Sequence, residues 1–247
     1  MSKLLFSLLA GAGLVALGYG LASSVLRQPS ASPAPARAAA VEPRRVAAEA
    51  PAPGGAADAA AIQSVWRAYR ASLMARNGAR ALTLVTPGSV ADYERQRALA
   101  VSLSRAQLQQ ADTLDRYMVL MLRARLSGAE LRRMSGSDLL RIAIERGWIG
   151  ANLPDEIEIE RIAGDRAYVV FRRSGAKLPG ELPALNRIGS TWLVDLVAMM
   201  RSFRPQLLAM LTAIAQAQKT DINGAMVLAV GTLTGSTPPE SIWDRPL

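Results

Sequence analysis

Apolar and charged residues alternate in one stretch late in the chain. Residues 157–162 show this alternation, and residues 167–171 run back with β-branched and aromatic side chains. Gly164 and Asp165 lie between the two segments and have the composition of a two-residue turn. The pattern predicts a β-hairpin.

Two further segments repeat this organisation. Residues 182–188 and 191–197 flank a second tight turn signal at Gly189 and Ser190. Strands joined by such short turns must be antiparallel. We therefore expect an antiparallel meander of three or four strands within residues 156–200.

The pattern before this meander is helical, over residues 61–150. The first helix is predicted to end at Asn77-Gly78, and its apolar stripe recurs at helical spacing in Ile62, Val65, Trp66, Tyr69 and Leu73. Capping-box spacing, in which a serine and a residue three positions later satisfy free N–H groups at a helix start, then recurs. The pairs are Ser89 with Asp92, Ser104 with Gln107, Ser127 with Glu130, and Ser135 with Asp138. Several short helices are predicted.

Helical spacing returns after the meander, in residues 203–234. Pro205 stands where a helix start tolerates proline, and Thr220-Asp221 is a capping signal for a second apolar segment. The tail that follows is too rich in proline for a helix. Its Trp243 is expected to fold back onto the domain, since a large aromatic ring gains free energy from burial.

The N-terminus contains 23 uncharged residues, from Leu4 to Leu26. At 1.5 Å per residue, a helix of this length spans the bilayer core of about 30 Å. We interpret residues 1–26 as an uncleaved transmembrane anchor, with a cleaved signal peptide as the alternative, because small residues at Gly20 and Ala22 precede Ser23. The expected location is the bacterial inner membrane with the domain in the periplasm. With cleavage, the protein would be soluble in the periplasm or secreted.

Residues 27–60 are rich in proline and alanine and lack large apolar side chains. Such a composition predicts a disordered linker. The folded domain is expected to occupy residues 61–247. The sequence leaves the oligomeric state open.

Composition excludes several kinds of chemistry. The chain has no cysteine and no histidine, so disulfides, thiolate nucleophiles, histidine bases and the usual zinc ligand sets are absent. The formal net charge is +9, and the excess lies in residues 61–150, with fourteen basic and seven acidic side chains. Arginines on solvated helix faces or a surface for an anionic partner would both produce this excess. Nucleic acid is not expected, because the sequence lacks aromatic-basic interleaving and a Gly-rich phosphate loop.

Three segments together resemble the nuclear transport factor 2-like superfamily. They are residues 65–69 in the first helix, residues 159–169 in the first hairpin, and residues 189–196 around the last turn. The resemblance implies an α+β fold with a cone-like antiparallel meander packed on helices. Here it would carry an N-terminal transmembrane helix, a helical insertion between Val90 and Gly147, and additional C-terminal helices.

Enzymes of this superfamily, such as ketosteroid isomerases, hold an acid or base pair inside the cone. By this resemblance, Asp195 is the weak catalytic candidate, with Tyr69 or Tyr93 as its phenol partner. Strand alternation would place Asp195 on the face of Leu193. The implied ligand pocket consists of Trp66, Tyr69, Leu193 and Asp195.

Glu156, Glu158 and Glu160 share one strand face, next to Asp155. Four oxygen donors suit calcium in principle, but no turning loop brings them together. A solvated face that blocks edge pairing is the favoured interpretation, so no metal and no cofactor are expected.

The favoured function is a non-catalytic, membrane-anchored binding or scaffold protein of the envelope with a protein partner. The alternative is a small-molecule carrier or an isomerase- or dehydratase-like enzyme that uses Asp195 and a tyrosine. An open cavity of about 300 Å³ lined by Asp195 would favour the alternative. An exposed apolar or basic patch would favour the scaffold.

Overall fold

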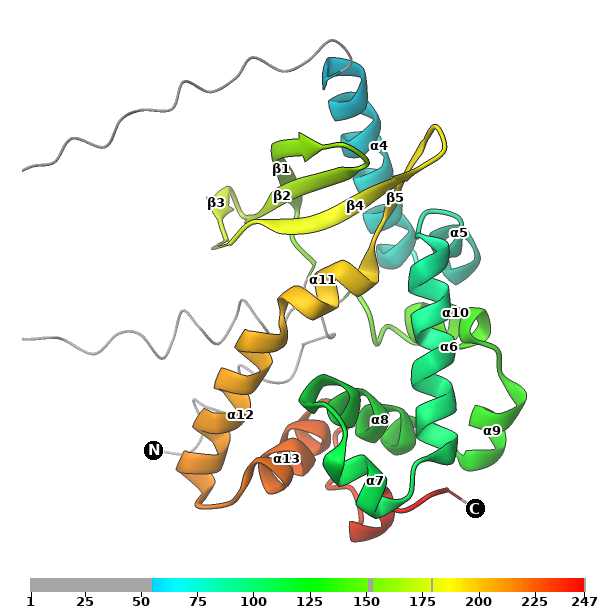
Figure 1. Ribbon diagram of the computed structural model, residues 1–247, viewed down its shortest axis with the longest axis vertical. Helices are drawn as coiled ribbons and strands as arrows, with labels where there is room; N and C mark the ends of the chain where they lie inside the picture. Colours follow the sequence, from blue (N-terminus) through cyan, green and yellow to red (C-terminus); the bar gives the residue numbers. More distant parts are fainter. Residues whose placement is uncertain (1–54, 151–152, 179, 247) are drawn as a thin grey trace, which may run out of the picture.

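Figure 1 shows the computed structural model of the chain, which describes residues 55–150, 153–178 and 180–246. These residues form an α+β structure with a five-stranded antiparallel sheet and many helices. The predicted anchor or signal peptide (1–26) and nearly all of the predicted linker (27–60) lie outside them. In the described part, no helix is both long enough and apolar enough to cross a bilayer.

The sheet confirms the predicted meander. Its order is β1-β2-β4-β5, the two-residue β3 pairs with β2, and all pairs are antiparallel. Each predicted turn begins with a glycine that has a positive φ, 59° at Gly164 and 61° at Gly189. Glycine adopts such angles without steric cost. The strands are β1 (Glu156–Ala163), β2 (Arg166–Arg173), β3 (Ala176–Lys177), β4 (Leu182–Ile188) and β5 (Thr191–Val194).

One face of the sheet packs on α4 (Gly55–Met74), the helix with the predicted aromatic stripe. The Trp66 ring centroid lies 5.2 Å from that of Phe171 on β2. At the sheet edge, Gln63 Nε2 donates to the carbonyl of Ile157 at 2.8 Å. The expected packing of the meander on a helix is confirmed, and the apolar stripe around Trp66 makes this contact.

Short helices follow α4, as predicted. Three predicted capping boxes are present, at Ser104, Ser127 and Ser135. The fourth, Ser89 with Asp92, is wrong because Thr86 is the N-cap of α6 and accepts from the Ser89 N–H at 3.2 Å. The helices are α5 (Gly78–Leu82), α6 (Pro87–Ser102), α7 (Arg105–Gln110), α8 (Thr113–Arg125), α9 (Gly128–Arg133) and α10 (Gly136–Glu145).

The prediction that the sheet continues to Met200 is wrong. The chain leaves β5 after Val194 and forms α11 (Leu196–Ser202). Asp195 is the N-cap of this helix, and its Oδ1 accepts from the Ala198 N–H at 3.0 Å. Because a carboxylate at this position satisfies a free N–H group, it favours a helix start over a longer strand.

The predicted C-terminal helices are confirmed as α12 (Arg204–Gln218) and α13 (Ile222–Thr234). The tail contains one 3-10 turn, η1 (Glu240–Trp243), where the sequence predicted no helix. The Trp243 side chain is buried, as predicted.

Arg123 of α8 holds this tail in place. Its guanidinium donates to four backbone carbonyls, those of Ala100 (2.9 Å), Leu103 (2.6 Å), Ile242 (3.3 Å) and Trp243 (2.9 Å). Burial lowers the pKa of Arg123, and no carboxylate of the described residues forms an ion pair with it. One side chain therefore joins α6, α8 and the tail.

We expect Arg123→Met to destabilise the protein by about 2–4 kcal/mol, since hydrogen bonds from a charged donor are lost and buried carbonyls remain unpaired. Urea unfolding of the full chain measures this change. Hydrogen exchange should also rise selectively in residues 240–246.

Arg133→Met is the matched control, because this exposed arginine makes no hydrogen bond or ion pair in the described structure. Equal stability losses in the two variants would contradict the role of Arg123.

Candidate functional site

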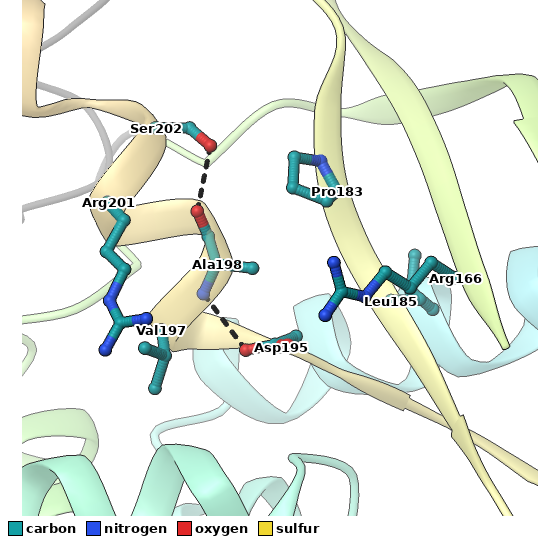
Figure 2. Close-up of a pocket in the computed structure, with 8 residues that line it drawn as sticks. All are labelled: Arg166, Pro183, Leu185, Asp195, Val197, Ala198, Arg201 and Ser202. Atoms are coloured by element: carbon teal, nitrogen blue, oxygen red, sulfur yellow. Dashed lines mark hydrogen bonds between the residues drawn. The ribbon is translucent and has the colours of Figure 1, made fainter. Parts of the chain in front are cut away.

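An open groove of about 370 Å³ lies between the sheet and α11 (Figure 2). Residues of β2 and β4 form one side, and α11 forms the other. Its apolar lining is Pro183, Leu185, Val197 and Ala198, and its polar lining is Arg166, Asp195, Arg201 and Ser202.

The backbone around the groove has few free hydrogen-bonding groups. β4 is paired on both sides, with β2 and with β5. Pro183 has no N–H group, and the Ala198 N–H donates to Asp195. The Ala198 carbonyl accepts from the Ser202 hydroxyl at 2.9 Å (Figure 2). The polar groups that this groove offers are therefore mainly those of side chains.

Two guanidinium groups supply the free donors. Arg166 begins β2 and Arg201 lies in the last turn of α11, and both side chains are exposed. Neither makes an ion pair with a carboxylate of the described residues. By contrast, the neighbouring Arg204 pairs with Asp112, and Arg187 pairs with Asp58 and Asp165.

Arg201 also acts on a polar cluster behind the groove. Burial raises the pKa of Asp115, but hydrogen bonds from Arg95 and Gln96 and the charges of Arg95 and Arg201 outweigh burial and hold this pKa below its ordinary value. The charge of Arg201 therefore stabilises the ionised form of Asp115 on α8, although Arg201 forms no ion pair with it in the described structure.

The N-terminus of α11 is fixed from two sides. Asp195 caps it from within the chain, and the buried Ser89 of α6 accepts from the Leu196 N–H at 2.9 Å. The Ser89 hydroxyl also bonds Thr86 Oγ1 at 2.8 Å. These bonds position the helix that carries Arg201.

The predicted pocket residues are not brought together. Of the four, only Asp195 lines the groove. Trp66 and Tyr69 are each 1% exposed and lie in the core between α4 and the sheet. Leu193 is half-buried and does not line the groove, and β5 buries Trp192 and Val194 on its other face.

The two candidate phenols lie in the interior. Burial raises the pKa of Tyr69, and the nearby Tyr93 raises it further; burial likewise raises the pKa of Tyr93, with a smaller effect from Asp92. The Tyr69 hydroxyl has no hydrogen-bond partner in the described structure. Neither tyrosine lines the groove with Asp195.

The acidic strand face is neutralised by basic side chains. Glu158 bonds both Lys177 and Arg172, which hold its pKa below the ordinary value, and Glu160 pairs with Lys177 at 3.0 Å. In the described part of the chain, no group of three or more acidic, histidine or cysteine side chains is arranged to hold a metal ion.

Sequence reasoning missed Arg166 and Arg201. Arg166 directly follows the first hairpin turn, and Arg201 follows two methionines at the end of the predicted meander. Nothing in the local pattern separates them from arginines on solvated helix faces. That both arginines line one groove depends on where α11 begins.

No protein-family model, curated protein or solved structure matches this chain. The function must therefore be inferred from the residues around the groove.

The buried tyrosines predict an alkaline loss of stability. Burial raises the pKa of Tyr69, Tyr93 and Tyr117 in the folded state, so their stabilising effect is complete below the unfolded value of about 10 and is lost as the pH rises above it. Above that pH, each tyrosine should lower the free energy of unfolding by about 1.4 kcal/mol per pH unit.

Tyr69→Phe should remove one such contribution, as measured by urea unfolding between about pH 8 and pH 11. Near pH 7 the substitution should cost little, because the deleted hydroxyl has no partner. Tyr117→Phe, which also removes an unpartnered hydroxyl, should reduce the slope equally. An unchanged slope in Tyr69→Phe would show that this tyrosine ionises in the folded protein.

Proposed function

We propose that this protein is a non-catalytic binding module of the bacterial cell envelope that holds an acidic segment of a protein partner in the groove beside α11. The observation that carries the proposal is the pair of guanidinium groups, Arg166 and Arg201, which line one open groove without an ion-pair partner in the described structure. The groove thus offers two cationic donors to a ligand.

The chemistry of the lining favours a carboxylate. Guanidinium groups are planar and donate in a fork that matches the two oxygens of a carboxylate. The apolar lining, which includes Leu185 and Val197, would pack against the methylene groups and neighbouring side chains of an acidic residue. Asp195 leaves the lining with a net charge of +1, two arginines and one aspartate, so an anionic ligand is still preferred.

The alternative, a small-molecule carrier or isomerase-like enzyme, has one supporting observation. The groove volume of about 370 Å³ is within the range of small-molecule sites, and Asp195 lines it. The acid–base pair implied by the resemblance needs a tyrosine within hydrogen-bonding reach of the same ligand as Asp195. Tyr69 and Tyr93 lie in the core, which makes binding the better proposal.

We also propose that residues 1–26 anchor the domain to the inner membrane, with the domain in the periplasm. The support is the uncharged apolar run from Leu4 to Leu26, whose length matches a bilayer core. Kinship with the nuclear transport factor 2-like superfamily remains a proposal too. It is supported by an antiparallel sheet packed on a long N-terminal helix with an aromatic stripe.

Site-specific photo-cross-linking in intact cells tests the binding proposal. A benzoylphenylalanine at Val197 should cross-link to one protein partner, and the cross-linked peptide should contain Asp or Glu. In the Arg166→Ala/Arg201→Ala background the yield should fall at least about tenfold, because each lost charged hydrogen bond contributes about 1.5–3 kcal/mol.

The matched control is Arg80→Ala/Arg133→Ala, which removes the same charge from two exposed arginines outside the groove. An equal fall in both backgrounds would indicate a general charge effect and contradict the proposed site. Cross-linking that persists without Arg166 and Arg201 would contradict it as well.

A further inference from the structure

An exposed, uncharged helix face begins where the groove ends. This surface, the α12 face, consists of Pro205, Leu208, Ala209, Thr212 and Ala213. All five side chains are exposed, and Leu208 is 47% exposed. Their spacing of three and four residues places them on one side of α12. No described element covers that side.

The groove and the α12 face form one continuous strip. Only Phe203 separates α11 from α12, and its backbone angles (φ −87°, ψ −4°) lie near the helical region. Val197 and Arg201 lie four residues apart on one side of α11, and Pro205 is the second residue of α12. Figure 1 shows α12 leading on from the end of α11.

The charge pattern changes along this strip. Arg166 and Arg201 lie at its groove end, whereas no charged residue occurs between Arg204 and Lys219. A ligand that fits both parts has a carboxylate at one end and an uncharged surface over the rest. Such a ligand matches the strip in charge, with its carboxylate at the arginines and its uncharged part on the α12 face.

We propose, building on the function proposed above, that the partner segment is an amphipathic helix that lies along α11 and α12. Acidic side chains near one end of this helix pair with Arg166 and with Arg201. Its apolar face packs on the α12 face, around Leu208. The proposal thus specifies that the partner segment is a helix and which end of it lies at the arginines. The groove alone defines neither.

A helix fits this surface better than an extended segment does. The backbone groups of α12 are bonded within the helix, and β4 is paired on both sides, so the strip offers an extended chain no ladder of backbone partners. A helix satisfies its own backbone. Small side chains such as Ala209 and Ala213 also allow two helix axes to approach to about 8–10 Å.

A lipid surface is the less suitable partner. Helices that lie in a membrane interface bury several large apolar side chains. The α12 face has only one, Leu208, and its other members are Pro205, two alanines and Thr212. A protein helix therefore matches its chemistry better.

The spacing of cross-links tests the inference. Benzoylphenylalanine is placed at Val197 or at Ala209 of the full chain in intact cells, and the cross-linked partner residues are mapped by mass spectrometry. Twelve residues separate the two positions, which corresponds to about 18 Å along the path of α11 and α12. In a partner helix the two target residues should be about twelve residues apart, and in an extended segment only five or six.

Ala209→Arg and Ala213→Arg place a charge on the α12 face and should each lower the Val197 cross-link yield at least about tenfold. Ala129→Arg, at an exposed alanine of α9, is the matched control and should have no effect. Circular dichroism of each variant tests that the helices are retained.

The outcomes separate the two proposals. A spacing of five or six, normal yields in both α12 variants, or cross-links from Ala209 to lipid alone would overturn the helix inference while the groove proposal stands. Cross-linking that is indifferent to Arg166 and Arg201 overturns both. Dependence on the two arginines and on the α12 face, with a spacing of about twelve, supports both.

Discussion

The packing of Trp66 against Phe171 is the contact on which the rest of this domain depends. It joins α4 to β2, and Tyr69 extends the same aromatic group, with its ring centroid 6.2 Å from that of Trp66. Replacing a buried tryptophan by alanine typically costs about 3–5 kcal/mol, a large fraction of a domain's net stability. Because these rings fill the space between helix and sheet, the groove lies outside that space, where α11 leaves the sheet.

The arginines of the helical half have structural uses that formal charge does not reveal. Arg123 bonds four carbonyls, Arg97 bonds Glu94 and the carbonyl of Leu131, and Arg105 bonds Glu240 and Asp244 of the tail. A guanidinium that bonds carbonyls needs no carboxylate. An excess of arginine over acid therefore does not by itself require an anionic polymer as partner. The charge that lines the groove therefore says more about a partner than the net charge of the chain does.

The sequence was most informative where one local pattern dominates. Alternation with a glycine turn predicted both hairpins, and serine followed three residues later by Gln, Glu or Asp predicted three helix starts. Prediction from the sequence failed where two local patterns compete. Residues 195–200 have the apolar character of a buried strand, yet Asp195 satisfies the helix N–H of Ala198. Ser89 had the spacing of a cap, but Thr86 before Pro87 takes that position. The groove itself depends on tertiary contacts, which no local window contains.

The error at Asp195 and the location of the site have the same cause. If β5 continued to Met200, the chain would add strand length beside β4, and residue 201 would lie beyond the end of the sheet. Because the chain turns into α11 instead, Arg201 is carried back beside β4 and lines the same groove as Arg166 of β2. The hydrogen bonds of Asp195 and Ser89 that start this helix therefore also place Arg201 at the groove.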